Sequence, residues 1–259
     1  MRQLRVGLVL AVLALALPAS PGRAATTEPA ATPKAVCGPG SKPETGLQGR
    51  VPPADRLDGR AAKGYSCNAT LVGSFGKAGG FKVLRYVDKA KHECAYFDVS
   101  MSGVRVLDMS HPSKPVLTAT LTTPAMFSPH ESLALNQKRG LLVAVLGNAL
   151  TAPGIVDVYD VTKDCRHPVL DSSSAVGLLG HESGFSPDGR TYYATAAISG
   201  TMAAADLTDP KHPFMAWVGA GYTHGLTLSD DGKTAYTAGF PPGVLIPPGG
   251  LRNVVGRPA

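Results

Sequence analysis

Three histidines recur at similar positions along the chain, and imidazole is the side chain most often used to bind transition metals. His130, His181 and His224 are separated by 51 and 43 residues, and each begins a short segment with the pattern of a strand. Three neutral imidazoles that converged would suit zinc or copper. Alternatively, each histidine makes a structural hydrogen bond, and repetition of the surrounding segment explains why it recurs.

Carboxylates accompany two of these histidines. Glu131 and Glu182 follow them directly, whereas Gly225 occupies this place in the third segment. Adjacent side chains of a strand point to opposite faces. The sequence therefore predicts that these glutamates pack or form loop hydrogen bonds, rather than act as general bases beside the histidines.

Other sequence motifs of catalysis are missing. The chain has no Gly-x-Ser-x-Gly and no complete His-Glu-x-x-His, because Phe185 stands where the second histidine would be. It contains neither a phosphate-binding loop nor a dinucleotide fingerprint. The formal charge of +6 comes from scattered lysines and arginines, which does not indicate nucleic-acid binding.

The segments that must position the histidines read as hairpins. They are HESLALNQKRGLLVAVL from His130, HESGFSPDGRTYYATA from His181 and HGLTLSDDGKTAYTA from His224. Each holds a glycine-containing turn between two apolar runs, and glycine supplies the positive φ that a tight hairpin needs. The sequence predicts antiparallel strand pairs.

A second type of hairpin alternates with the first. Its copies are GVRVLDMSHPSKPVL from Gly103, GIVDVYDVTKDCRHPVL from Gly154 and GTMAAADLTDPKHPFMAW from Gly200. The equivalent aspartates in these copies are expected to accept backbone hydrogen bonds at turns, rather than to bind calcium. They are Asp108, Asp160 and Asp206, separated by 52 and 46 residues. Two hairpins form a four-stranded unit of roughly 40 to 50 residues, the size of a propeller blade, and such units bury their apolar faces by stacking.

The segments VRVLDMSHPSKP, IVDVYDVTKDCRHP and AAADLTDPKHP resemble the LVIVD repeat. The S-P-D-G and D-D-G-K hairpins resemble those of related YVTN-type propellers. The resemblance covers about residues 67–240 and implies an all-β protein, a β-propeller-type stack of four-stranded blades. It also implies an exported bacterial protein, and members of the family often have no assigned activity.

The sequence departs from the repeat after Thr237. No second hairpin of the Asp-(Ser/Thr)-x-Pro type follows, and four prolines occur within residues 241–248. Proline cannot donate to a strand ladder. We expect about three complete blades and a partial fourth, a propeller that does not necessarily close, and an open sheet edge that favours self-association. A C-terminally truncated member of the family would have this pattern.

The N-terminus has the pattern of a secretory signal peptide. Arg2 and Arg5 precede an apolar run over residues 6–17, and small residues follow. This run is too short to span a membrane. We expect cleavage after Ala24, which lowers the formal charge to +3 by removing three arginines and leaves a secreted chain without a transmembrane segment.

An even number of cysteines in an exported chain indicates disulfides. Cys37, Cys67, Cys94 and Cys165 allow three pairings, and we favour Cys37–Cys67 with Cys94–Cys165. A metal site is the less favoured use of these cysteines, because no Cys-x-x-Cys occurs.

Together these features predict five segments: a signal peptide (1–24), a disordered linker (25–35), an irregular cysteine-containing segment (36–66), the repeats (67–240) and an irregular Pro/Gly-rich tail (241–259). The favoured function is a secreted binding module for a protein or small-molecule ligand, without catalysis. The alternative is a copper- or zinc-binding propeller, including a copper-dependent oxidoreductase, that uses His130, His181 and His224.

Overall fold

The computed structural model describes residues 35–45, 51–77, 79–146, 154–178, 180–196, 200–220, 223–239 and 243–245. The chain divides into two compact units, Met1–Thr70 and Leu71–Ala259. The expected signal peptide, nearly all of the expected linker and residues 246–259 lie outside the described residues. None of the helices within the described ranges is long and apolar enough to cross a membrane.

The first unit contains little regular structure. It has a short helix α1 (Pro53–Leu57), a 3₁₀ turn η1 (Ala61–Lys63) and one isolated bridge between residues 42 and 66. The predicted disulfide Cys37–Cys67 is present. Asp55 is buried and accepts 2.7 Å hydrogen bonds from the hydroxyls of Thr45 and Tyr65. A cross-link and a buried carboxylate hold this unit.

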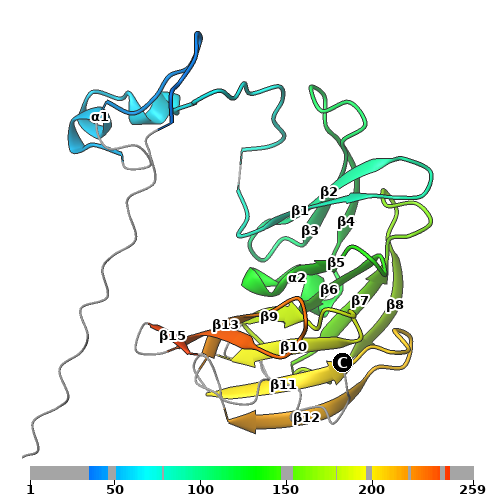
Figure 1. Ribbon diagram of the computed structural model, residues 1–259. Helices are drawn as coiled ribbons and strands as arrows, with labels where there is room; N and C mark the ends of the chain where they lie inside the picture. Colours follow the sequence, from blue (N-terminus) through cyan, green and yellow to red (C-terminus); the bar gives the residue numbers. More distant parts are fainter. Residues whose placement is uncertain are drawn as a thin grey trace, which may run out of the picture. The chain divides into compact units, whose positions relative to one another are not determined.

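The second unit is built of antiparallel sheets whose strands pair in chain order (Figure 1). The first sheet comprises β1 (Val83–Val87), β2 (Glu93–Asp98), β3 (Val104–Asp108) and β4 (Val116–Leu121). The second comprises β5 (Ala134–Asn136), β6 (Leu141–Val145), β7 (Val156–Asp160) and β8 (Val169–Ser174), and is preceded by the short helix α2 (Pro124–Phe127) and the 3₁₀ turn η2 (His130–Ser132). The third comprises β9 (Glu182–Phe185), β10 (Thr191–Ala196), β11 (Thr201–Asp206) and β12 (Phe214–Ala220). The fourth comprises β13 (Thr223–Leu228), β14 (Ala235–Gly239) and β15 (Gly243–Leu245).

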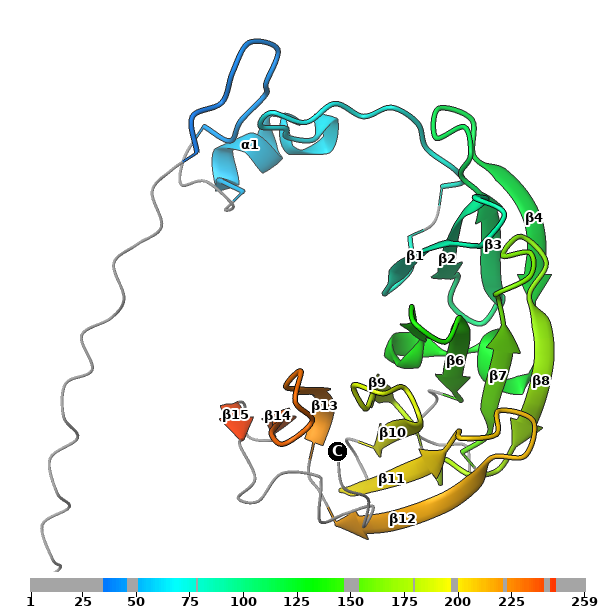
Figure 2. The same ribbon diagram turned by 45° about the vertical axis from the view of Figure 1, so that its right-hand side comes forward.

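These four sheets follow one another along an open arc (Figure 2). In Figure 2, β1 and β9 lie on the inner side of the arc, and β4, β8 and β12 lie on the outer side. Among the described residues no further sheet joins the fourth back to the first. The predicted all-β propeller-type stack of about three complete blades and a partial fourth is confirmed, and closure, which the sequence left open, is not seen among the described residues.

Turn residues explain the inner hairpins. Gly140, Gly189 and Gly232 have φ between 62° and 68°, in the left-handed region that glycine tolerates best. Each donates its N–H to the carbonyl oxygen three or four residues earlier. The inner hairpins therefore turn at the residues that the sequence predicted.

The repeated aspartates also behave as expected. Oδ1 of Asp108, Asp160 and Asp206 accepts the backbone N–H two residues further on, at 2.7–2.9 Å. Each aspartate is the last residue of its strand, and its carboxylate accepts a backbone hydrogen bond within the turn of the outer hairpin.

Apolar side chains fill the space between successive sheets. The second and third strands of each complete sheet carry many of them, and all five residues of β6 and all six of β10 are buried, two of the latter being threonines. Val106 and Leu142 belong to the core between the first two sheets. Val158 and Tyr192 belong to the next core, and the last core is built around Tyr193.

Covalent and polar links join neighbouring sheets. The predicted disulfide Cys94–Cys165 ties β2 to the loop after β7. Arg139 donates three hydrogen bonds of 2.7–3.2 Å to carbonyl oxygens of the third sheet and its turns. The disulfide thus joins the first sheet to the second, and Arg139 joins the second to the third.

Hydroxyl groups near the start of the outer strands add a second set of links. Thr118 of β4 donates to the Arg166 carbonyl oxygen at 2.8 Å, and Ser172 of β8 donates to the Pro210 carbonyl oxygen at 2.6 Å. At the corresponding places β12 carries Ala216 and Trp217, which have no hydroxyl. This kind of link therefore stops at the third sheet.

The structure adds one strand that the sequence did not predict. β15 falls in the Pro/Gly-rich segment for which only irregular structure was expected, and it pairs with β14 from Thr237 to Gly239. Four residues free of proline lie between two Pro-Pro pairs, and three of them, Gly243–Leu245, make this short pairing.

Candidate functional site

The three repeated histidines meet on the inner side of the arc. His130 opens η2, His181 directly precedes β9, and His224 is the extra residue of a bulge in β13, where the register with β14 shifts. A bulge redirects a side chain that regular alternation would send elsewhere. The inner edges of the second, third and fourth sheets thus bring together residues 94 positions apart.

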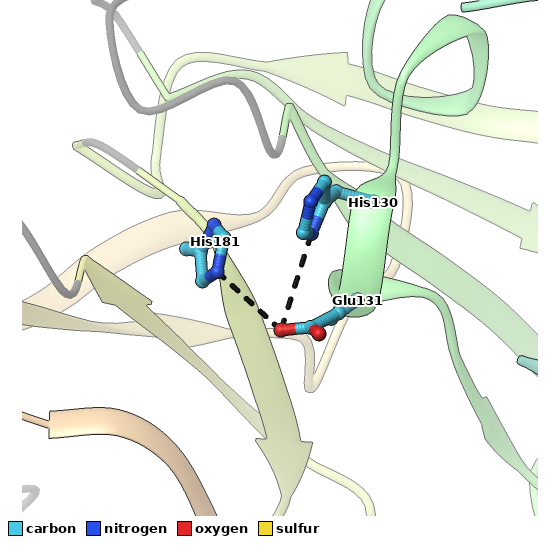
Figure 3. A group of neighbouring side chains, drawn as sticks. All are labelled: His130, Glu131 and His181. Atoms are coloured by element: carbon cyan, nitrogen blue, oxygen red, sulfur yellow. Dashed lines mark ion pairs between the residues drawn. The ribbon is translucent and has the colours of Figure 1, made fainter. Parts of the chain in front are cut away.

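The ligand atoms of this cluster are close together. His181 Nε2 lies 3.0 Å from His224 Nε2. Glu131 Oε2 lies 3.3 Å from His224 Nε2, 3.4 Å from His181 Nε2 and 4.0 Å from His130 Nδ1. Figure 3 shows Glu131 reaching from η2 towards both His130 and His181. We call His130, Glu131, His181 and His224 the histidine cluster.

His130 Nδ1 and Glu131 Oε2 are buried without a hydrogen bond among the described residues, and they face each other. Buried polar atoms nearly always have a hydrogen-bond partner, and each exception calls for an explanation such as an ion. Both of these atoms are suitable metal ligands.

A second carboxylate supports the cluster from behind. Glu182 Oε2 lies 3.3 Å from Nδ1 of His224, on the side of the ring opposite Nε2. A carboxylate at Nδ1 fixes the tautomer in which Nε2 carries the free lone pair. Gly225 leaves room for it, because a Cβ there would lie 1.9 Å from Glu182 Oε2.

Hydrogen bonds from the third sheet fix the backbone of the cluster. Thr195 Oγ1 is within 2.6 Å of the His224 carbonyl oxygen and 3.0 Å of the Glu182 carbonyl oxygen. Tyr192 Oη donates at 2.9 Å to the carbonyl oxygen of Ser132, at the end of η2. The site therefore depends on the packing of sheet against sheet.

The first sheet contributes an aromatic ring and a cation. The Phe81 ring stacks on the His130 ring with centroids 4.1 Å apart, and Lys82 Nζ lies 3.7 Å from Glu182 Oε1. Buried Asp98 accepts the backbone N–H of Phe81 at 2.9 Å and that of Lys82 at 3.4 Å. Asp98 thereby fixes both residues just before β1.

Glu131, His181 and His224 have the donor types and the mutual spacing of three ligands of a tetrahedral metal site, and His130, Glu131 and His181 also group their ligand atoms within 4.8 Å. Metal–nitrogen bonds of about 2.0–2.1 Å in a tetrahedron put neighbouring ligand atoms about 3.3 Å apart. Three of the four distances given above lie between 3.0 and 3.4 Å. The fourth, between His130 and Glu131, is wider at 4.0 Å.

The sequence offered convergence of the three histidines as one of two alternatives, and it did not expect the glutamates beside them. The expectation for Glu131 assumed that His130 opens a strand. Instead His130 has φ of 52° and begins a 3₁₀ turn, so the alternation rule does not apply to it. Phe81 and Lys82 were missed because the first sheet has no histidine segment that would mark the equivalent position.

A second polar cluster links the first two sheets. His92 Nδ1 lies 2.9 Å from Asp88 Oδ2 and 3.8 Å from Asp164 Oδ1, next to the Cys94–Cys165 disulfide. Asp88 Oδ2 also accepts the backbone N–H of Cys165 at 3.1 Å. Side-chain hydrogen bonds from Arg166 hold the pKa of Asp164 well below its ordinary value. These contacts explain the cluster as a structural network.

Comparison with solved structures gives only distant similarity. The chain is similar to a protein of unknown function from Desulfotomaculum acetoxidans (13% identity, TM-score 0.45, 67% of this chain and 56% of that chain). It is also similar to a candidate 6-phosphogluconolactonase from Bacteroides uniformis (15% identity, TM-score 0.43, 65% and 53%). A third similar structure is the periplasmic gluconolactonase of Pseudomonas aeruginosa (14% identity, TM-score 0.40, 62% and 55%).

The order of the strands within the sheets and the arc of successive sheets make the fold β-propeller-like. The chain spans just over half the length of each of these three proteins. No protein-family profile matches it, and no curated protein matches it either.

Proposed function

We propose that this chain is an exported, propeller-like protein that binds one divalent transition metal ion, zinc or copper, through His130, His181, His224 and Glu131. The proposal rests on one observation: donor atoms from three sheets approach one another at 3.0–4.0 Å. Imidazole nitrogen with one carboxylate oxygen is a donor set that suits both metals.

The polar environment supports an ion rather than hydrogen bonding alone. His130 Nδ1 and Glu131 Oε2 are buried without a hydrogen bond among the described residues, so one cation between them would satisfy both atoms. Glu182 holds His224 in the tautomer whose Nε2 faces the cluster. Glu131 supplies a negative charge that offsets part of the charge of the ion.

Export and membership of the LVIVD family are part of the same proposal. Two disulfides are typical of an oxidising compartment. The three aspartate turns, each followed by a Pro-containing turn and an outer strand, support the family. The chain remains a binding protein in this proposal, and the metal is what its inner edge binds.

Metal loading tests the function. The signal-cleaved protein is incubated with zinc or copper, freed of unbound ion and subjected to elemental analysis. About one equivalent is expected per chain, and it should be lost when the three clustered histidines are replaced by alanine.

The chain offers a matched control. Replacing the exposed histidines of the outer hairpins, His111, His167 and His212, also removes three imidazoles but none of the histidine cluster. This variant should retain the equivalent of metal. Absence of stoichiometric metal in the parent, or equal loss in both triple variants, would reject the proposal.

A further inference from the structure

The residues that the first sheet presents to the histidine cluster point to a ligand of the metal. They are Phe81 and Lys82, and neither contributes a metal-binding atom. Both are fixed by Asp98, which is itself 1% exposed, so their position is built into the fold. A fixed cation and a fixed aromatic ring beside a metal site suit a ligand that has one charged end and one apolar end.

The charges around the site favour an anion. Glu131 and Glu182 carry two negative charges, and Lys82 and a divalent ion would together carry three positive charges, with the imidazoles neutral. These groups would therefore together carry one positive charge once the metal is bound, while the carboxylate of buried Asp98 is directed to the backbone N–H groups of Phe81 and Lys82. Lys82 Nζ lies 3.7 Å from Glu182 Oε1, and its side chain is 29% exposed, so it remains open to a second partner.

The aromatic ring is exposed although it belongs to the site. Phe81 is 55% exposed while it stacks on His130 at a centroid distance of 4.1 Å. His130 is also a member of the widest pair of the cluster, with its Nδ1 4.0 Å from Glu131 Oε2. An additional ligand would therefore enter most easily beside Phe81, and zinc accepts a fifth ligand while copper(II) favours more than four.

We propose that the metal-loaded site binds a small organic carboxylate, whose carboxylate group lies near the metal and Lys82 and whose apolar body rests on Phe81. This inference rests on the proposed metal site and names the ligand class of that site. The ligand is a monoanion, because one positive charge remains to be neutralised.

Cobalt(II) gives a direct measurement, because its visible absorption changes with the number and kind of its ligands. The full signal-cleaved protein is loaded with cobalt(II) and titrated with benzoate, with acetate and with neutral benzamide. Benzoate should bind most tightly. Acetate should lack the contribution of the apolar body, and benzamide should bind at least about tenfold more weakly than benzoate, as expected for loss of a charged contact.

Two variants assign the contacts. Lys82→Met should weaken benzoate about tenfold, the scale of one charge-assisted contact, and Phe81→Ala should bring benzoate close to acetate. Lys233→Met is the control for the lysine, since its side chain is 58% exposed in a distant turn. Phe214→Ala is the control for the aromatic ring, because Phe214 lies on an outer strand and is 55% exposed, as Phe81 is.

The outcomes separate the two proposals. Failure of the parent to bind cobalt(II), zinc or copper removes the metal site, and this inference with it. Cobalt(II) binding without a response to benzoate, or with equal binding of benzoate and benzamide, overturns the carboxylate ligand and leaves the metal site standing. Bound cobalt is measured in every variant. Loss of cobalt from Lys82→Met would make Lys82 a residue that positions Glu182, and would also overturn the inference.

Discussion

Gly225→Ala should weaken metal binding although residue 225 donates no ligand atom. A Cβ at this position would lie 1.9 Å from Glu182 Oε2 and 2.4 Å from its Cδ. Ordinary contacts begin at about 3.4 Å, so the carboxylate must move by about 1.5 Å. The 3.3 Å contact between Glu182 Oε2 and His224 Nδ1 cannot survive such a shift.

The expected size of the effect follows from the role of that contact. Loss of the carboxylate that orients a ligating histidine lowers metal affinity about 10- to 100-fold. The strand itself should tolerate the change, because Gly225 does not have the positive φ that an alanine would resist, and the displaced group is the end of a flexible side chain. Affinity is measured for zinc by competition with a chromophoric chelator, and the thermal unfolding of the apo form checks the fold.

Two further variants make this prediction specific. Glu182→Gln should weaken zinc binding by a similar factor, and the double variant should be little weaker than either single one, because both changes act through the same contact. Thr227→Ala, on the exposed side of the same strand, is the control. Zinc affinity in Gly225→Ala within about twofold of the parent, or effects that add in the double variant, would refute the role given to Glu182.

Three other predictions concern the links between sheets. Replacing Cys94 and Cys165 by alanine removes a cross-link between residues 71 apart and should lower the free energy of unfolding by about 4 kcal/mol in the chain-entropy model, measured by urea denaturation. Arg139→Gln removes three hydrogen bonds to backbone carbonyl oxygens and should lower the same quantity by about 2–3 kcal/mol. The pKa of Asp164 in the folded protein lies below its ordinary value of 3.8, because Arg166 hydrogen bonds to the charged form. Ionised Asp164 therefore contributes its full share to the free energy of unfolding at pH values above 3.8, and this share is lost as the pH falls below that value. In Asp164→Asn, the free energy of unfolding should consequently decrease less steeply on acidification below about pH 5.

Neighbouring positions provide the controls for these predictions. Lys138→Gln removes an exposed cation beside Arg139, and Asp230→Asn removes an exposed carboxylate from a turn of the fourth sheet. Both variants should unfold like the parent. Equal stability of the Arg139 variant and the parent would contradict the link to the third sheet. An unchanged acid profile in the Asp164 variant would contradict the role of its ion pair.

The repeating part of the fold was predictable because its signals are local. A glycine with positive φ in each inner turn and an aspartate that folds over each outer turn act within a few residues, and both recur at the spacing of a blade. Stacking then follows, because a four-stranded sheet with two apolar faces must be covered on both.

The site was predictable only in part, because its details depend on contacts distant in the sequence. His181 and His224 could be aligned by their hairpins. The 3₁₀ turn at His130 could not be foreseen, since its last residue, Ser132, is fixed by the hydroxyl of Tyr192, 60 residues away. Phe81 reaches the cluster from a sheet whose inner strand carries no repeat signal at all.

The uneven anchoring of the sheets has a consequence for local opening. Hydroxyl links join the first sheet to the second and the second to the third, whereas β12 offers only Ala216 and Trp217 at the corresponding places. The third sheet holds the fourth at the inner edge, where Thr195 Oγ1 donates to the His224 carbonyl oxygen at 2.6 Å. The fourth sheet lacks the outer hydroxyl link, however, and has three strands among the described residues, so it should fray first, with the fastest amide hydrogen exchange among the inner strands. That sheet also carries His224, so a metal ion bound by His224 together with His130 and His181 would cross-link the fourth sheet to the second and third. Metal binding should therefore protect β13 and β14 from hydrogen exchange and proteolysis.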